Sequence, residues 1–331
     1  MREKIIKLKD EIGFSSYAAV GGFEEKRGPL GNKFDICDSS DKFSMKTFEE
    51  AEGEMSRIAL NAALTKSNLS HKDLSLIVAG DLQNQCVASS GGLSSFGVPY
   101  IGLYGACSTC TEALMVLTSF LSASSYMMGA AVTSSHNGAA EKQFRMPLEY
   151  GGIRAPSAQW TATAAGAFIL SKNSVDVKIK ELMPGVIVDS TSLDSSNMGA
   201  AMAFSAADSI VSYFEESGYS PESFDYIVTG DLGRVGSDLL KDILSEKNPR
   251  AARRHIDCGN LLYDFESQDC HSGSSGCGTS ASVLAVEFLP SIKRGDIGDI
   301  LFLSTGALMS PLSVLRKNSI LGISPLLRIG K

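Results

Sequence analysis

The sequence lacks any excess of positive charge. Its 331 residues carry 30 Lys and Arg against 37 Asp and Glu, which gives a formal net charge of −7. This balance argues against nonspecific binding to nucleic acid, and it provides no general attraction to anionic lipid. We therefore expect no nucleic-acid partner, and an acidic ligand would need a local site lined by cations or backbone N–H groups.

Long apolar runs and targeting signals are also missing. No stretch approaches the roughly 18 apolar residues of a membrane span, and the first residues lack the apolar region of a secretory signal. The seven cysteines are too sparse to indicate a disulfide framework. The Gly-rich segments have neither GxGxxG nor Walker spacing, so nucleotide binding is poorly supported. We expect a soluble protein of a reducing compartment without a transmembrane segment.

The sequence does contain a turn of small residues that leads into an apolar helix, GLYGACSTCTEALMVL at residues 102–117. Cys107 lies where the first N–H groups of the helix lack partners and the helix dipole is positive, which favours a thiolate or a bound anion. It is therefore either an enzyme nucleophile or the floor of an anion-binding pocket, with a small core residue as the ordinary alternative. The CxxC pair of Cys107 and Cys110 is weak support for zinc or redox chemistry, because no second pair or nearby His accompanies it.

The order of elements repeats along the chain. The letters IVAGDL at residues 77–82 return as IVTGDL at 227–232, and Gly-rich turns enter helices at both Cys107 and Cys277. The two hexapeptides are 150 positions apart and the two cysteines 170, so the second half holds about 20 extra residues, which we place in 253–271. We predict a duplication, with one half at 1–172 and the other at 173–331.

Hydrophobic patterning predicts the elements of both halves. Helices are expected at 48–64 and 201–216, strands at 15–20, 74–79, 128–133, 161–170, 177–188 and 224–229, and a Ser/Gly loop at 88–97. Such apolar strands are typical of a parallel sheet with helices on both faces. The predicted fold class is therefore α/β, a duplicated α-β-α-β-α layered fold in which the helix starts at Cys107 and Cys277 meet near the centre.

Five stretches carry a resemblance to a known superfamily. They are YGACST at 104–109, AVTSSH at 131–136, LEYGGIRAPSAQW at 148–160, DCG at 257–259 with Tyr263 and Asp264, and QDCHSGSSGC at 268–277. With them the chain resembles the thiolase and ketoacyl-synthase superfamily over nearly its whole length. The AQW and SGC letters are not general thiolase features, and they point to a sporulation branch of that superfamily.

This resemblance implies a sporulation function. It implies that the protein binds dipicolinic acid (pyridine-2,6-dicarboxylate), free or as its calcium chelate, and supports its uptake into the developing spore without a cofactor. Implied partners are membrane proteins of the stage V sporulation A complex, and the implied location is the forespore, peripheral on the spore inner membrane. Superfamily members are usually dimers, so a homodimer is the default expectation.

The resemblance also bears on catalysis. Condensing enzymes of the superfamily use a His after the strand that here ends at Thr229, and a Gly-Asn in the turn that here spans 276–280. This sequence has Gly230 and Asp231 at the first place and Cys or Gly at the second. We therefore expect noncatalytic binding. An active acyltransferase or ketoacyl synthase using Cys107 and a structural scaffold for spore membrane channel proteins are the alternatives.

Two helix starts that face one cavity would offer two sets of free N–H groups, so we hypothesise that each holds one carboxylate of the ligand. Other polar groups have ordinary alternatives. Ser134 and Ser135 either donate to a carboxylate or cap a turn. Arg145 and Arg154 lie in a long loop, where either could pair with an anionic ligand, with a solvated arginine as the default. His271 lies just before the Ser-Gly-Cys turn, which makes it a weaker candidate for the site. No metal site is expected. The predicted ligand-binding residues are Cys107, Ser135, His136, Asp231, Ser275 and Cys277.

Overall fold

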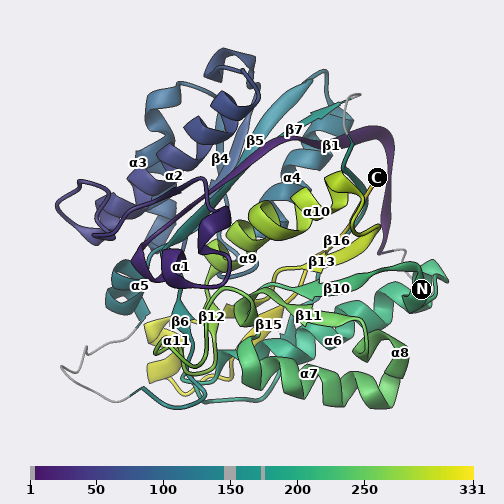
Figure 1. The fold of residues 1–331 in the computed structure, drawn as a ribbon. Helices are drawn as coiled ribbons and strands as arrows, with labels where there is room; N and C mark the ends of the chain where they lie inside the picture. Colours follow the sequence, from purple (N-terminus) through teal and green to yellow (C-terminus); the bar gives the residue numbers. More distant parts are fainter. Residues whose placement is uncertain (1–3, 145–153, 173–175) are drawn as a thin grey trace.

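The computed structural model describes residues 4–144, 154–172 and 176–331, and most of its strands belong to one sheet of eleven (Figure 1). The first half contributes β1 (Ile6–Gly21), β3 (Ile77–Gly80), β4 (Tyr100–Gly102), β5 (Met128–Ser135) and β7 (Ala164–Lys172), in the spatial order β4-β3-β5-β7-β1. The second half contributes β8 (Lys178–Met183), β10 (Tyr226–Thr229), β11 (His255–Asp257), β13 (Ile300–Leu303) and β16 (Leu326–Gly330), in the order β11-β10-β13-β16-β8. The short strand β2 (Ile36–Cys37) pairs with β1.

Strand directions repeat as well. β3 is parallel to β4 and β5, and β10 is parallel to β11 and β13. β7 lies antiparallel between β5 and β1, as β16 lies antiparallel between β13 and β8. β1 and β8 pair antiparallel and join the two sets. This matching order and direction confirm the duplicated fold. The boundary placed after residue 172 stays a prediction, because 173–175 lie outside the described residues.

The helices form three layers around these two sets of strands (Figure 1). α4 (Thr109–Ala123), α9 (Cys277–Val283), a π-helical turn (Leu284–Phe288) and α10 (Leu289–Arg294) lie in the middle and pack in one core with residues from both sets of strands. α2 (Phe48–Lys66) and α3 (Val87–Leu93) cover the first set, and α6 (Met198–Ser217) and α7 (Gly233–Lys247) cover the second. These are the predicted α-β-α-β-α layers, with the helix starts at 107 and 277 in the central layer.

Helix ends follow local chemistry. Thr47 caps α2 by accepting from the Glu50 N–H at 3.1 Å, while the Glu50 carboxylate accepts from the Thr47 N–H, which is a capping box. α6 begins with an Asn197 cap and ends at Gly218, whose φ of +69° is favourable for glycine. The predicted helices at 48–64 and 201–216 are thus confirmed, with ends extended by a few residues.

Four sequence-based assignments need correction. The strand predicted at 161–170 is divided into β6 (Trp160–Thr161), which pairs with β12 (Ser274–Ser275), and β7 of the large sheet. The predicted loop at 88–97 is mostly helical, since α3 is followed by a 3₁₀ turn at Ser94–Phe96. A Cβ on Gly92 would lie 2.0 Å from the carbonyl oxygen of Gly53, so glycine here permits close packing of α3 on α2. β1 is much longer than the strand predicted at 15–20, and the strand predicted at 177–188 is divided into β8 and β9 (Val188–Asp189).

The window Ala106–Ala123 reaches the length and hydropathy of a membrane span, contrary to our expectation that no stretch would. Within the structure 67% of this window is buried. It contains α4, which lies in the central layer between the two sets of strands. Its apolar character is therefore that of a core helix.

The extra residues of the second half lie mainly where they were predicted. β11 ends at Asp257 and α9 begins at Cys277, whereas β4 ends at Gly102, close to Cys107. We call residues 258–271 the inserted segment. A smaller part of the difference in length arises because α7 is longer than α3.

The remaining α-helices and strands are α1 (Phe23–Arg27), α5 (Asn137–Phe144), β6 (Trp160–Thr161), α8 (Pro249–Ala252), β12 (Ser274–Ser275), β14 (Gly306–Leu308), α11 (Pro311–Leu315) and β15 (Leu321–Ile323).

Candidate functional site

A cavity of about 400 Å³ opens at Cys107. Cys107 and Ser275, both predicted site residues, lie in its wall together with Ala106, Gln159 and Arg154. Most other lining side chains are apolar, among them Leu82, Phe144, Met198, Met309, Val314 and Leu315. The cavity therefore combines an apolar body with a few polar groups, as small-molecule sites commonly do.

The turn before α4 places the Cys107 thiol at the cavity. Ala106 has a φ of +53°, a left-handed conformation that is uncommon for a residue with a side chain. The Cys107 Sγ lies 3.8 Å from the Oγ of Ser275, which belongs to β12 and directly precedes the turn into α9. The two helix starts therefore approach one another at this cavity, as the repeat predicted.

Asp231 lies at the end of β10, where the resemblance places a catalytic His in condensing enzymes. Its carboxylate is buried and accepts hydrogen bonds from the Gly276 N–H at 2.8 Å, the Thr305 hydroxyl at 2.9 Å and the Ser275 hydroxyl at 3.2 Å. These partners come from two other segments of the chain, so Asp231 ties the ends of β10 and β13 to the start of α9.

The electrostatics of this pair oppose a reactive thiolate. Burial, followed by the charge and hydrogen bond of the neighbouring Asp231, holds the pKa of the Cys107 thiol well above its ordinary value. Burial also raises the pKa of Asp231 to about 6, although hydrogen bonds partly offset it. The prediction that the helix start favours a Cys107 thiolate is therefore wrong, because desolvation and a nearby carboxylate outweigh the helix dipole.

Cys277 and Ser135 lie beside the helix start but are not among the residues that line the cavity. The Cys277 thiol donates to the Ser134 carbonyl at 2.9 Å. The Ser135 hydroxyl donates to the Ala162 carbonyl and accepts from the Gly278 N–H. Asp231 and Ser135 already occupy the N–H groups of Gly276 and Gly278, so these two donors at the start of α9 are not free in the way that the two-helix hypothesis assumed.

His136 is also held away from the cavity lining. Its Nε2 bonds the Asp41 carbonyl at 2.7 Å, its Nδ1 accepts from the Gly138 N–H at 3.1 Å, and its ring packs on Phe48. Burial lowers the pKa of this imidazole below its ordinary value. The structure thus gives His136 a role in joining the loop at residue 41 to β5 and does not place it among the groups that line the cavity.

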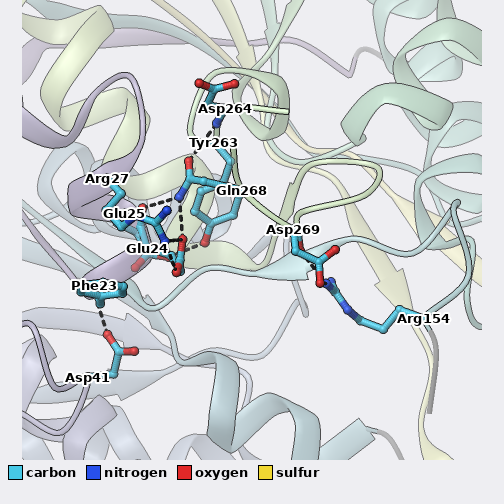
Figure 2. Close-up of polar contacts among 10 residues, drawn as sticks. All are labelled: Phe23, Glu24, Glu25, Arg27, Asp41, Arg154, Tyr263, Asp264, Gln268 and Asp269. Atoms are coloured by element: carbon cyan, nitrogen blue, oxygen red, sulfur yellow. Dashed lines mark hydrogen bonds and ion pairs between the residues drawn. The ribbon is translucent and has the colours of Figure 1, made fainter. Parts of the chain in front are cut away.

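Arg154 is the predicted loop residue that the structure brings to the cavity. Its guanidinium pairs with Asp269 of the inserted segment (Figure 2). It also lies 4.6 Å from the centre of the Trp160 ring. His271 contacts the same Asp269 through Nε2 at 2.9 Å and the Ala155 carbonyl through Nδ1 at 2.9 Å. Arg145 lies outside the described residues.

Sequence reasoning missed the roles of several polar side chains. Gln159 lines the cavity and donates from Nε2 to the carbonyls of Asp231 and Ser274. Glu25 of α1 is buried, and its carboxylate accepts from the Thr163 N–H and from the Tyr263 hydroxyl of the inserted segment (Figure 2). Burial raises the pKa of Glu25 to about 7. The sequence offered one signal for these roles, namely that Gln159 and Tyr263 lie in stretches that set this chain apart. Gln159 belongs to the AQW letters, and Tyr263 belongs to the inserted segment.

Within the described ranges, no group of three or more His, Cys, Asp or Glu side chains is arranged to hold a metal ion. Cys110 of the CxxC pair is fully buried, and burial raises the pKa of its thiol to about 12. Hydroxyl groups of Thr133, Ser280 and Ser304 partly offset this effect of burial on the pKa. The CxxC pair is thus explained by packing on either side of the helix start.

Comparison with known proteins agrees with this architecture. The family described as stage V sporulation protein AD matches residues 2–329. The chain is 37% identical over 309 residues to stage V sporulation protein AD of Bacillus subtilis (strain 168), covering 93% of this chain and 91% of that protein.

Solved structures of OleA from Xanthomonas campestris share the fold. A glutamate-to-glutamine variant superposes with a TM-score of 0.64 at 14% identity over 98% of this chain and 100% of that one. A cerulenin-bound co-crystal gives a TM-score of 0.63 at 13% identity over 98% of each chain. At this identity the likeness concerns the fold alone, and it confirms the predicted thiolase-like class.

Proposed function

This chain belongs to the stage V sporulation protein AD family, and from that premise we propose that it binds dipicolinic acid without catalysing acyl transfer. The binding supports uptake of dipicolinate into the developing spore, either as the free dianion or as the calcium chelate. The proposed site is the cavity at Cys107, whose volume of about 400 Å³ falls within the roughly 300–1,000 Å³ common for small-molecule sites.

The buried Asp231 carboxylate beside Cys107 carries the noncatalytic part of this proposal. Thioester chemistry needs a thiolate, and it needs donors to stabilise an oxyanion. Here burial, and after it the charge of Asp231, keeps the pKa of the Cys107 thiol high, and the Asp231 carboxylate already accepts from the Gly276 N–H at the start of α9. A negative charge at this place disfavours both the thiolate and an oxyanion near it. None of the described residues that line the cavity is a histidine.

The proposal includes partners that no contact in this structure tests. We place the protein peripherally on the spore inner membrane with proteins of the stage V sporulation A complex. A homodimer is supported by β4, which ends the strand order of the sheet and can pair with a second copy. Sedimentation velocity that returned only the monomer mass would remove the homodimer from the proposal.

A thermal-shift titration with dipicolinate, calcium dipicolinate and acetyl-CoA tests the function. A ligand at 100 times its Kd adds about 2.7 kcal/mol to the stability of the folded state, enough to raise Tm by several degrees. We expect this shift with dipicolinate or its chelate. Mass spectrometry after incubation with acetyl-CoA is expected to show no acyl group on Cys107.

Two outcomes contradict the proposal in different ways. An acyl adduct on Cys107 that is absent from the Cys107→Ala variant would favour the acyltransferase alternative. No shift with any ligand would favour the structural scaffold. Cys277→Ala is the matched control, because Cys277 is a buried helix-start thiol that does not line the cavity.

A further inference from the structure

We propose that Arg154 is the anion anchor of this cavity and that Asp269 of the inserted segment is the residue that positions it. Arg154 would hold a carboxylate of a small ligand with an apolar ring. The identity of that ligand as dipicolinate rests on the proposed function, whereas the anchoring role rests on the contacts of Arg154 itself.

The guanidinium of Arg154 is held rigidly on one side. Its Nη2 donates to the Asp269 carbonyl at 2.5 Å and lies 3.0 Å from the Asp269 Oδ2 (Figure 2). Its Cζ lies over the Trp160 ring, 4.6 Å from the ring centre. Only 12% of the side chain is exposed. A planar, stacked guanidinium loses little further freedom when it binds a carboxylate, so it is suited to oriented recognition of that group.

The other side of the guanidinium is unsatisfied. The Arg154 Nη1 is buried and has no hydrogen-bond partner among the described residues. A buried donor that lacks a partner costs free energy, and this cost is relieved when a ligand supplies an acceptor. Since Arg154 lines the cavity, a carboxylate within the cavity can supply that acceptor.

Gln159 also has a buried polar atom without a hydrogen-bond partner within the described ranges, but this atom is an acceptor, whereas that of Arg154 is a donor. Its Nε2 donates to two carbonyls, at 2.7 and 2.8 Å, which fixes the orientation of its amide. Its Oε1 is buried and lacks a partner within the part of the chain that the structure describes. Two residues that line one cavity, five positions apart in the sequence, thus carry a buried unpaired donor and a buried unpaired acceptor, in a wall that is otherwise largely apolar.

Among the described residues that line the cavity, Arg154 is the one cation and Glu141 the one acid. The Gly276 and Gly278 N–H groups at the start of α9 are occupied, and Asp231 contributes a negative charge close to Cys107. The Asp269 side chain is 78% exposed, so solvent screens its charge more than that of the buried guanidinium. The inserted segment, which breaks the symmetry between the two halves, thereby positions the cation that the cavity needs.

Isothermal titration calorimetry with dipicolinate, on the full chain, tests this assignment. Arg154→Gln is expected to weaken binding about 10- to 100-fold, the range for loss of a hydrogen-bonded charged partner. Asp269→Asn is expected to weaken binding by only about 3- to 5-fold, because the contact of Arg154 with the backbone carbonyl of residue 269 remains. Asp269→Glu, which keeps the charge, should restore the binding. The neutral pyridine-2,6-dicarboxamide should bind weakly and respond little to Arg154→Gln.

Trp160, the only tryptophan of the chain, gives a second measurement. We expect dipicolinate to change its fluorescence in the wild-type protein, with the change lost in Arg154→Gln. Arg234→Gln is the matched control, since Arg234 also stacks on an aromatic ring, Phe265 of the inserted segment, without lining the cavity. Circular dichroism melting of each variant shows whether it has folded.

The outcomes separate this inference from the proposed function. If the wild type binds dipicolinate and folded Arg154→Gln binds equally well, the anchor is wrong while the function stands. If the wild type binds isophthalate but not dipicolinate and Arg154→Gln abolishes that binding, the anchor stands while the function fails. If the wild type binds neither dicarboxylate, both are overturned.

Discussion

Asp81 and Asp231 end equivalent strands in the two halves, after nearly identical letters, yet their carboxylates have different tasks. Asp81 accepts from the Gln83 N–H and from the N–H and hydroxyl of Ser89, all within eight residues. Asp231 accepts from Ser275, Gly276 and Thr305, which are at least 44 residues away in the sequence. The Asp81 carboxylate stabilises the turn that directly follows its strand, and the Asp231 carboxylate connects distant segments around the cavity. We call these two strand ends, with the partners of each carboxylate, the Asp81 corner and the Asp231 corner.

Asp257 explains how Asp231 became available for this task. In the first half Asp81 holds the start of α3 through Ser89. In the second half the start of α7 is held by Asp257, which accepts from the N–H groups of Leu232 and Gly233 at 2.9 Å. The duplicated scaffold therefore keeps the structural bond with another acid, and Asp231 can face Cys107.

The comparison predicts that truncating Asp231 lowers the free energy of unfolding more than truncating Asp81 does. This is the largest effect that we expect. Asp231→Ala leaves three buried donors unpaired and should lower the free energy of unfolding by about 3–5 kcal/mol. Asp81→Ala also unpairs donors, but it removes a negative charge next to buried Glu52 and should cost about 1–2 kcal/mol. Urea unfolding of both variants measures the difference, and equal losses would show that the two corners are energetically equivalent.

The pH dependence of stability should differ between the corners as well. Burial and the charge of Asp81 raise the pKa of Glu52 from 4.5 to about 8, whereas Asp231 reaches about 6. A folded-state pKa above the unfolded value means that the folded protein binds more protons, so stability falls as the pH rises through this interval. The Glu52 contribution is complete below about pH 4.5 and is lost by about pH 8.

Glu52→Gln should therefore flatten the fall in unfolding free energy between about pH 5 and 8, by roughly 2–4 kcal/mol across that range. Asp231→Asn should flatten only the portion of this fall in unfolding free energy that lies below about pH 6. Burial raises the pKa values of Glu25 and Asp257 to about 7. Because these two groups remain in both variants, the free energy of unfolding should still fall somewhat with pH in each. Urea unfolding at several pH values measures this, and an unchanged slope in Glu52→Gln would refute the assignment to that carboxyl.

Much of the fold was predictable because its signals are local. Apolar periodicity and the repeated hexapeptide identified the strands ending near Gly80 and Thr229, and the duplication then fixed their arrangement. The helix α3 was missed because Ser89, Ser90, Gly91 and Gly92 have low helix propensity. Its stability comes from contacts that the segment itself does not encode, namely the bond from Ser89 to Asp81 and the close packing of Gly92 on Gly53.

The candidate site was predictable only where it coincides with the repeat. Cys107, Asp231 and Ser275 lie at helix starts or strand ends that the duplication brings together, and the structure places them in contact with one another or with shared partners. His136 follows a strand in the same way, but its orientation depends on the distant Asp41 carbonyl. The importance of Arg154 depends on Asp269, 115 residues away, so no local pattern could distinguish it from a solvated arginine.

The two helix-start cysteines give the smallest and most specific test of the comparison. At pH 8 burial and the charge of Asp231 suppress the Cys107 thiolate, while Cys277 is fully buried and donates to the Ser134 carbonyl. Asp231→Asn retains an acceptor but removes the charge, so it should lower the pKa of the Cys107 thiol and speed its alkylation by iodoacetamide about tenfold. Cys277 should stay unreactive in both proteins, and peptide mass spectrometry resolves the two sites. Equal acceleration at both cysteines would indicate general loosening of the core, and no acceleration at Cys107 would show that burial alone suppresses its thiolate.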